Sequence, residues 1–323
     1  MSAPLSVGER SAAPGRSPRQ RLAVAGLAVL LVLAVLSAWL LWDNRRLTVA
    51  RYEVAVTSAD AAADGVADAA DEGTGVGASP AADGGGLPAG GLRIAQVSDL
   101  HAADFGDFQD RLLTAVDDVH PDLIALTGDV IDRRTGDLTA VLELAASLTA
   151  LAPTYMVLGN HDADSDLRGE LLAGLEGAGV VILRDEATTL TVGGTRITLA
   201  GLDDPRVAWD AGRTPTPPRQ ILDRLDLPKD GTTVLLAHRP ELLEEYAGED
   251  VDLVLSGHAH GGQVRLPLIG PLFAPHQGFL PALAEGVHTS GTTTMVISRG
   301  LGNSIAGVRV NDPRELVIID LVG

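Results

Sequence analysis

Cysteine is absent from the 323-residue chain, and lysine is nearly absent, since Lys229 is the only one. Without cysteine, the chain can form no disulfides, thiolate zinc sites or cysteine nucleophiles. Any metal that this protein binds must therefore be held by oxygen and nitrogen atoms.

Positive charge is scarce as well, because 24 Lys and Arg residues face 43 Asp and Glu residues, for a net charge of −19. This field repels nucleic-acid backbones unless metals or a basic patch reverse it, so we expect no nucleic-acid partner. We interpret the excess charge as a solvated acidic surface. A hydrophobic content of 46% with 21% charged residues is typical of globular proteins and allows one large catalytic domain.

One long apolar run lies near the N-terminus, where residues 22–42 carry no charge. A bilayer core about 30 Å thick requires roughly 20 such residues in a helix. We therefore predict a transmembrane helix over 22–42, preceded by a disordered cytoplasmic tail over 1–21. A cleaved signal peptide is the alternative, but its apolar region of about 7–15 residues would be shorter.

The rest of the chain divides into a linking region, 43–91, and a catalytic domain, 92–323. The linking region begins with a possible strand at 48–57 and continues as a flexible insertion rich in Ala, Gly and Asp. In the catalytic domain, apolar runs alternate with helical patterns, which indicates buried sheets covered by helices in an α/β sandwich. The expected strands are 92–97, 123–127, 154–158, 180–183, 197–200, 233–237, 253–256, 295–298 and 316–321. The expected helices are 108–119, 138–148 and 167–175.

Polar residues follow five of these strands. They are Asp99, His101, Asp129, Asn160, His161, Asp162, His238, His258 and His260. Any one such motif is more often a turn than a ligand. However, five of the eight histidines lie in these motifs, at the strand ends where open α/β sheets bind ligands. Together the motifs predict a metal site.

Other polar residues lie close to the motifs but have simpler interpretations. Asp132, Asp203 and Asp204 are expected to cap turns, and Arg239 and Arg299 to bind substrate phosphate or form ordinary ion pairs. The three remaining histidines are expected in surface or structural positions, with His276 able to line the cleft: His120, His276 and His288.

The order of the motifs resembles the calcineurin-like metallophosphoesterase superfamily, in which Asp-x-His, Gly-Asp, Gly-Asn-His-Asp/Glu, His and Gly-His-x-His follow one another. The resemblance covers roughly residue 92 to the C-terminus and implies a four-layer α/β/β/α sandwich. The segments 258–267 and 298–302 look like a bacterial, membrane-associated branch, which includes relatives that act on UDP-diacylglucosamine.

This resemblance implies two divalent cations. One would be held by Asp99, His101, Asp129 and His260. The other would be held by Asp129, Asn160, His238 and His258, so that Asp129 bridges the two. Carboxylate, amide and imidazole ligands suit Mn, Fe or Zn. Two cations about 3.5–4 Å apart activate a bridging water for attack on phosphorus.

The resemblance also gives His161 a catalytic role, either in stabilising the transition state or in protonating the leaving oxygen. Asp162 is expected to orient His161 by accepting its second ring N–H, or else to cap a helix N-terminus.

The expected function is therefore hydrolysis of a phosphate ester or pyrophosphate by metal-activated water, and the membrane helix favours a lipid-linked or envelope substrate. We expect a single-pass protein of the cell membrane with its catalytic domain outside the cytoplasm. A non-catalytic, metal-bound module displayed on the membrane is the alternative. A carboxylate-pair glycosidase is remote, because it would not need this set of histidines. The sequence does not address the oligomeric state.

Overall fold

A computed structural model describes residues 17–56, 91–102, 106–192, 195–229, 231–248, 250–303 and 307–322. The chain divides into two compact units, Met1–Trp42 and Asp43–Gly323. The predicted insertion and most of the predicted N-terminal tail lie outside the described residues.

The described part of the first unit is a helix, α1 (Pro18–Asp43), whose last residue is the first residue of the second unit. It contains the predicted apolar run and extends a few residues beyond it toward the N-terminus, beginning at a proline, which suits a first helical turn. Its side chains are exposed, except that Leu40 is half-buried and Asp43 is buried. Among the described residues, this is the one helix long and apolar enough to cross a membrane, by length and composition alone.

The second unit contains two six-stranded sheets. The first has the order β1 (Leu47–Ala55), β16 (Arg314–Val322), β2 (Leu92–Val97), β3 (Leu123–Leu126), β4 (Thr154–Met156) and β5 (Val181–Ile182). The second has the order β14 (Gly286–Ser290), β15 (Thr293–Ile297), β9 (Leu253–Ser256), β8 (Thr232–Leu236), β7 (Thr195–Gly201) and β6 (Glu186–Val192). Strands β2 to β5 are parallel, as are β7, β8, β9 and β15.

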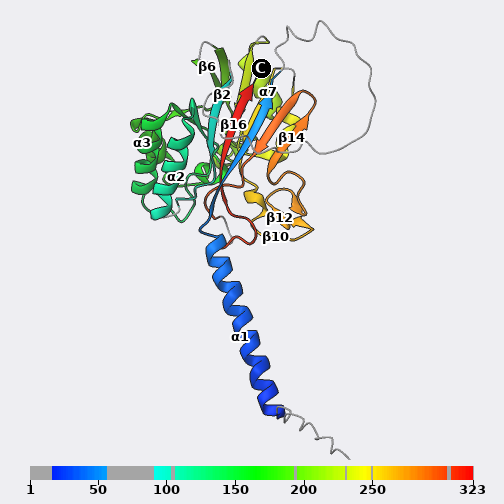
Figure 1. Ribbon diagram of the computed structural model, residues 1–323. Helices are drawn as coiled ribbons and strands as arrows, with labels where there is room; N and C mark the ends of the chain where they lie inside the picture. The colour runs from blue at the N-terminus through cyan, green and yellow to red at the C-terminus, as the bar shows by residue number, and fades with distance from the viewer. Residues whose placement is uncertain are drawn as a thin grey trace, which may run out of the picture. The chain divides into compact units, whose positions relative to one another are not determined.

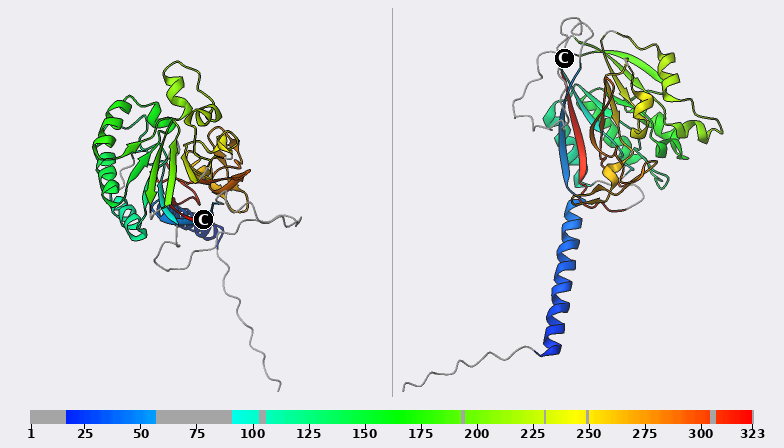
Figure 2. Two further views of the ribbon diagram at one scale, coloured as in Figure 1. Left: turned by 90° about the horizontal axis from the view of Figure 1, so that it is seen from above. Right: turned by 90° about the vertical axis from the view of Figure 1, so that its right-hand side faces the viewer.

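Three apolar cores separate the layers. The middle core packs the two sheets face to face, for instance Ile94 and Val317 of one sheet with Val234 and Leu255 of the other. An outer core lies between the first sheet and helices α2 (Asp107–Val119), α3 (Thr139–Leu151) and α5 (Arg168–Gly177). The third core packs the second sheet against the short helices α7 (Pro218–Leu225) and α8 (Leu243–Tyr246). The predicted α/β sandwich is confirmed, and Figures 1 and 2 show α2 and α3 outside the first sheet.

Strand β1 joins the first sheet as its edge, in parallel with β16 over nine residue pairs. It is therefore a strand of the second unit, which begins at Asp43. Two short hairpins complete the unit. They are β10 (Arg265–Leu266) with β11 (Gly270–Pro271), and β12 (Phe273–Ala274) with β13 (Gly278–Phe279).

Candidate metal centre

The loops that follow five central strands meet at one place. Asp99 and His101 follow β2, Asp129 follows β3, and Asn160 begins the short helix α4 (Asn160–Ala163) after β4. From the second sheet, His238 follows β8, while His258 and His260 follow β9. Backbone hydrogen bonds hold the first two loops together. The Asp99 N–H donates to the backbone carbonyl of Gly128 (3.0 Å), and the His101 N–H donates to the backbone carbonyl of Asp129 (2.9 Å).

One group of side chains consists of Asp99, His101, Asp129 and His260, all buried, with ligand atoms within 4.8 Å of one another. The Nε2 atoms of His101 and His260 lie 3.0 Å apart. His260 Nε2 is also 3.3 Å from Asp99 Oδ1, and His101 Nε2 is 3.8 Å from Asp129 Oδ2. These four residues are the set that the resemblance gives for one cation.

A second buried group consists of Asp129, His238 and His258. His238 Nε2 lies 3.2 Å from Asp129 Oδ2 and 3.2 Å from His258 Nδ1. The other ring nitrogen of His238, Nδ1, donates to the carbonyl of Thr127 (2.7 Å), which leaves Nε2 for the centre. Asp129 belongs to both groups, so one carboxylate faces two neighbouring sets of ligands.

The electrostatics of these groups fit divalent cations. Burial lowers the pKa of His101 to about 4, and it holds the pKa values of His258 and His260 well below the usual range. Neutral imidazoles at this spacing direct lone pairs at one another unless a proton or a cation lies between them. Asn160 adds a buried Oδ1 that has no hydrogen-bond partner among the described residues.

The two carboxylates differ in the net shift of their pKa values. Burial raises the pKa of Asp99 to about 6, although the charge of His238 opposes this. For Asp129 burial acts in the same direction, but the charges of the nearby histidines and the hydrogen bond to His238 together hold the pKa well below its usual value. Burial lowers the pKa of His238, yet the charges of the nearby aspartates and the hydrogen bond to Asp129 together raise it to about 10. The His238 ring thus faces Asp129 at a position where a cation would neutralise the same carboxylate.

The backbone around the centre is unusual, because five of the candidate ligands have positive φ angles. They are Asp99 (53°), His101 (50°), Asp129 (53°), His258 (67°) and His260 (51°). Non-glycine residues adopt this region at a cost, and such strain tends to cluster at functional sites. Two glycines permit the close packing: a Cβ on Gly159 would lie 2.2 Å from Asp129 Oδ1, and one on Gly257 would lie 2.3 Å from Asp99 Oδ2.

The Asp162 carboxylate does not orient His161 as predicted. Its oxygens accept the backbone N–H groups of Asp129 (2.7 Å), Gly159 (2.9 Å) and Ile131 (3.0 Å). Asp162 stands at the third position of α4 and accepts the N–H that precedes the helix, so the capping interpretation is the better one. The same carboxylate ties the Asp129 loop to the Asn160 helix.

His161 lies at the cleft, half-buried, with its ring edge-on to that of His101 at a centroid distance of 4.9 Å. Its backbone N–H donates to Asp129 Oδ1 (2.8 Å), and its buried Nδ1 has no hydrogen-bond partner among the described residues. The ring therefore lines the cleft while its Nδ1 points away from solvent.

The cleft above the centre has a volume of about 430 Å³. Besides the motif residues, its lining includes Arg133, Arg134, Arg206, Trp209, Arg239 and His276. Of these, only Arg239 and His276 were considered from the sequence. Arg133 and Arg206 both contact the Asp164 carboxylate. The cleft thus offers guanidinium groups and an indole close to the metal ligands.

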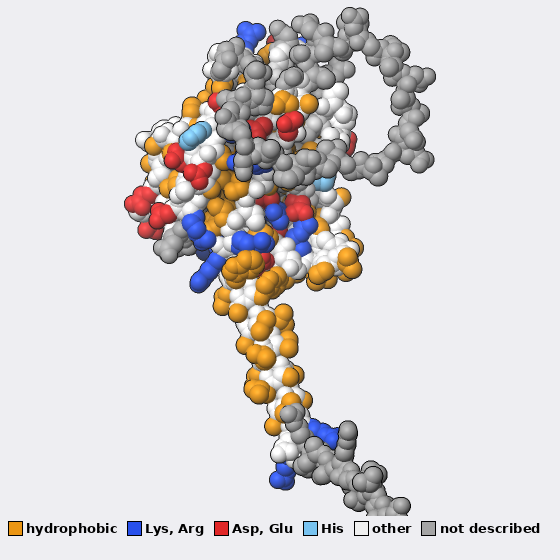
Figure 3. Space-filling view, viewed as in Figure 1, with side chains coloured by type: hydrophobic (Ala, Val, Ile, Leu, Met, Phe, Trp, Pro, Cys, Tyr) orange, Lys and Arg blue, Asp and Glu red, His pale blue; other side chains and the backbone are white. Residues whose placement is uncertain are grey.

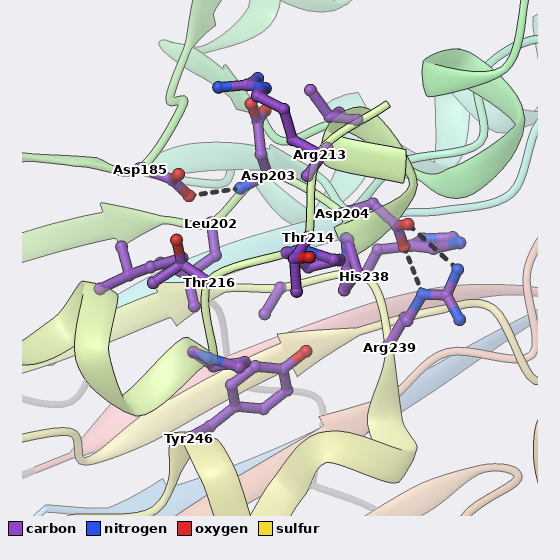
Figure 4. Close-up of a pocket in the computed structure, with 17 residues that line it drawn as sticks. Asp185, Leu202, Asp203, Asp204, Arg213, Thr214, Thr216, His238, Arg239 and Tyr246 are labelled. Carbon is purple, nitrogen blue, oxygen red and sulfur yellow. Dashed lines mark hydrogen bonds and ion pairs between the residues drawn. The ribbon is translucent and has the colours of Figure 1, made fainter. Parts of the chain in front are cut away.

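The two arginines next to the motifs both form ion pairs. Arg239 holds the Asp204 carboxylate through Nε (2.6 Å) and Nη2 (3.1 Å), as Figure 4 shows beside a small cavity of about 140 Å³. Arg299 pairs with Glu315, whose Oε1 accepts from both Nε (3.0 Å) and Nη2 (2.8 Å) of the guanidinium. Asp204 also caps helix α6 (Pro205–Asp210), in agreement with the capping expectation.

Comparison with known proteins identifies the family to which the chain is similar. The family model for calcineurin-like phosphoesterase matches residues 92–262. Over 236 residues the chain is 30% identical to the uncharacterized metallophosphoesterase YkuE of Bacillus subtilis, and the alignment covers 72% of this chain and 79% of that protein. Over 237 residues it is 32% identical to the phosphodiesterase YaeI of Escherichia coli, and the alignment covers 72% of this chain and 82% of that protein. It is also 29% identical over 187 residues to a transmembrane protein with metallophosphoesterase domain of Danio rerio, and that alignment covers 54% of this chain and 41% of that protein.

Proposed function

This chain belongs to the calcineurin-like phosphoesterase family and is a metal-dependent phosphoesterase, and from this we propose that it hydrolyses phosphodiesters with two divalent cations. Asp99, His101, Asp129 and His260 would hold one cation. Asp129, Asn160, His238 and His258 would hold the other. The observation that carries the proposal is the position of Asp129, whose carboxylate belongs to both buried groups.

When bound, the two cations would supply an activated water and neutralise charge on the phosphate oxygens. The protein's own contribution is to hold the ligands in place. Asp162 fixes the Asp129 loop through its bonds to the amides of Asp129 and Ile131. His161 faces the cleft beside His101, and we assign it the transfer of a proton to the leaving oxygen. Its position in the lining of the cleft and its partial exposure agree with that role.

A non-catalytic metal-bound module is disfavoured, because family membership and the placement of His161 in the cleft both favour catalysis. We propose a phosphodiester as the preferred bond because one relative at 32% identity is named a phosphodiesterase. If α1 anchors the chain in a membrane, a lipid-linked or envelope phosphoester would be within reach of the site.

Removal of metal is expected to abolish activity. The full chain, treated with a chelator and then dialysed, should lose hydrolysis of bis(p-nitrophenyl) phosphate, and added Mn²⁺, Fe²⁺ or Zn²⁺ should restore it. Metal analysis should find two ions per chain. Hydrolysis that persists in the stripped protein, or a single bound ion at full activity, would contradict the two-cation site. Parallel assays with p-nitrophenyl phosphate and with pyrophosphate would establish which bond is preferred.

We also propose that α1 crosses the cell membrane and that the catalytic domain lies outside the cytoplasm. Arg16, Arg19 and Arg21 precede the apolar run, and Arg45 and Arg46 follow it, so charge alone sets the orientation weakly. A phosphatase reporter fused after residue 323 is expected to be active, since such reporters function outside the cytoplasm. An inactive phosphatase fusion, together with an active cytoplasmic reporter at the same position, would reverse the orientation.

A further inference from the structure

The two short hairpins of the second unit expose an unusual number of large apolar side chains. Leu268 is fully exposed and Phe279 is 83% exposed. We define the apolar hairpin face as Leu266, Leu268, Ile269, Phe273, Phe279 and Leu280, all exposed on β10 to β13 or in the turns beside them. Figure 3 shows hydrophobic side chains gathered at the edge of the domain where Figure 1 labels β10 and β12. Contiguous exposed apolar surface marks a place of interaction.

The backbone of these hairpins is a second indication that the apolar hairpin face contacts another apolar surface. Leu268 and Leu280 adopt φ angles of 68° and 54°, a region in which leucine is strained. Gly270 and Gly278, in the same hairpins, adopt φ angles of 92° and 78° without that strain. A turn that faced water would gain nothing from leucine at such positions, whereas an apolar surface would stabilise them.

The base of the hairpins lies where the chain enters the second unit. Asn44, the residue after α1, donates from Nδ2 to the Arg309 carbonyl (2.8 Å) and accepts the Arg309 N–H (2.7 Å). The next residue, Val310, accepts the Arg265 N–H (2.9 Å) and donates to the Gln263 carbonyl (2.8 Å). Asn44 directly follows an apolar helix of membrane-spanning length. Hydrogen bonds thus connect this residue, through Arg309 and Val310, to the start of β10.

The second hairpin also borders the cleft. Its turn contains Pro275 and His276, both of which line the cleft, and His276 Nδ1 lies 3.0 Å from His258 Nε2. The strands of the same hairpin expose Phe273 and Phe279, whose rings meet edge to face at 5.6 Å. A surface that binds this face therefore approaches the opening of the cleft.

We propose that the apolar hairpin face rests on a lipid bilayer, so that the cleft receives a phosphoester whose apolar part remains in the membrane. This inference rests on the membrane anchoring and the phosphoesterase activity proposed above. A bilayer is favoured over a protein partner because β10 is connected by hydrogen bonds, through Arg309 and Val310, to Asn44, the residue that follows the apolar helix in the sequence. In addition, the exposed Arg45 follows that helix closely and can pair with lipid phosphates.

Site-directed spin labelling tests this placement directly, because the chain contains no cysteine that would interfere. The full chain would be reconstituted into vesicles of phosphatidylcholine and phosphatidylglycerol, with single substitutions Leu268→Cys and Phe279→Cys. Leu31→Cys in α1 serves as the lipid control. Val181→Cys, an apolar residue that is also exposed but lies on β5, serves as the water control. Collision with oxygen and with a water-soluble nickel complex then reports the surroundings of each label.

Labels at 268 and 279 are expected to resemble the label at 31, open to oxygen and protected from nickel. The proposal is overturned if they resemble the label at 181 while the label at 31 is in lipid. It is also overturned if their protection comes with dipolar broadening between labelled copies, which would assign the face to self-association. A water-exposed label at 31 would instead remove the membrane anchor on which the inference rests. Because no readout depends on hydrolysis, a failure of the proposed activity would appear separately in the assays above.

Discussion

Replacing Asp129 with alanine is expected to lower kcat/KM for phosphodiester hydrolysis by about 10³-fold or more. The carboxylate belongs to both buried groups, so a single truncation removes a ligand from each proposed cation. Metal ions contribute several kcal/mol to the stabilisation of such transition states, and each 1.36 kcal/mol corresponds to tenfold in rate. The substitution also removes the acceptor of the His161 N–H.

The measurement pairs steady-state kinetics with metal analysis of the purified variant. Asp137→Ala is the matched control, because Asp137 is an exposed carboxylate whose hydrogen bonds are to the nearby Thr139. The control should retain full activity and metal content. An Asp129→Ala protein that keeps two metals and a tenth or more of the activity would show that Asp129 does not bridge the cations.

Replacing His161 with glutamine is expected to lower kcat by about 10²–10⁴-fold while metal content stays unchanged, since general acid catalysis contributes this much. His161 faces the cleft, but it is outside both groups of candidate ligands. If it protonates the leaving oxygen, the loss should be large for an alkyl ester and much smaller for a p-nitrophenyl ester, whose leaving group requires little protonation. Kinetics with the two esters measure that difference.

His288→Gln is the control for this experiment, because His288 lies in β14 and bonds the carbonyl of Glu285 (2.9 Å). It should leave both rates unchanged. An equal loss on both esters would show that His161 contacts the phosphate rather than the leaving oxygen. A loss of bound metal in the His161 variant would make the residue part of the metal centre.

The sequence predicted the central strands because their position in the fold leaves a clear pattern. β3 and β9 are buried along their full length, and β2 and β8 nearly so. β3 is entirely apolar, and the other three are mostly apolar, although β2 includes Arg93 and Gln96. A polar residue directly after such a run must lie at the end of a buried strand. The proximity of the candidate ligands therefore followed from the parallel arrangement of the strands.

The two edge strands of the second sheet, β6 and β14, were not predicted, because they lack that pattern. β6 is mostly polar and only partly buried, and β14 contains glycine, histidine, threonine and serine. The strands of the two hairpins are two residues long, too short for any periodicity. Their apolar residues were therefore not recognised as an exposed surface.

The contacts of single side chains were also beyond the sequence. Asp162 is next to His161 in the chain, which suggested an interaction between them, but α4 turns its carboxylate toward the amides of the Asp129 loop. Arg206 and Trp209 reach the cleft from α6, which follows β7 rather than a motif strand. Neither residue carries a local signal of its position.

The pairing of β1 with β16 has a consequence for the synthesis of the protein. Among the described strands β1 comes first in the sequence and β16 last, and β16 lies between β1 and β2 in the sheet. Until the ribosome has translated β16, β1 has no neighbour in the sheet and β2 has an open edge. Contacts so distant in sequence form slowly. The strand next to the apolar helix can thus dock only after translation of β16, when the helix itself has long since emerged.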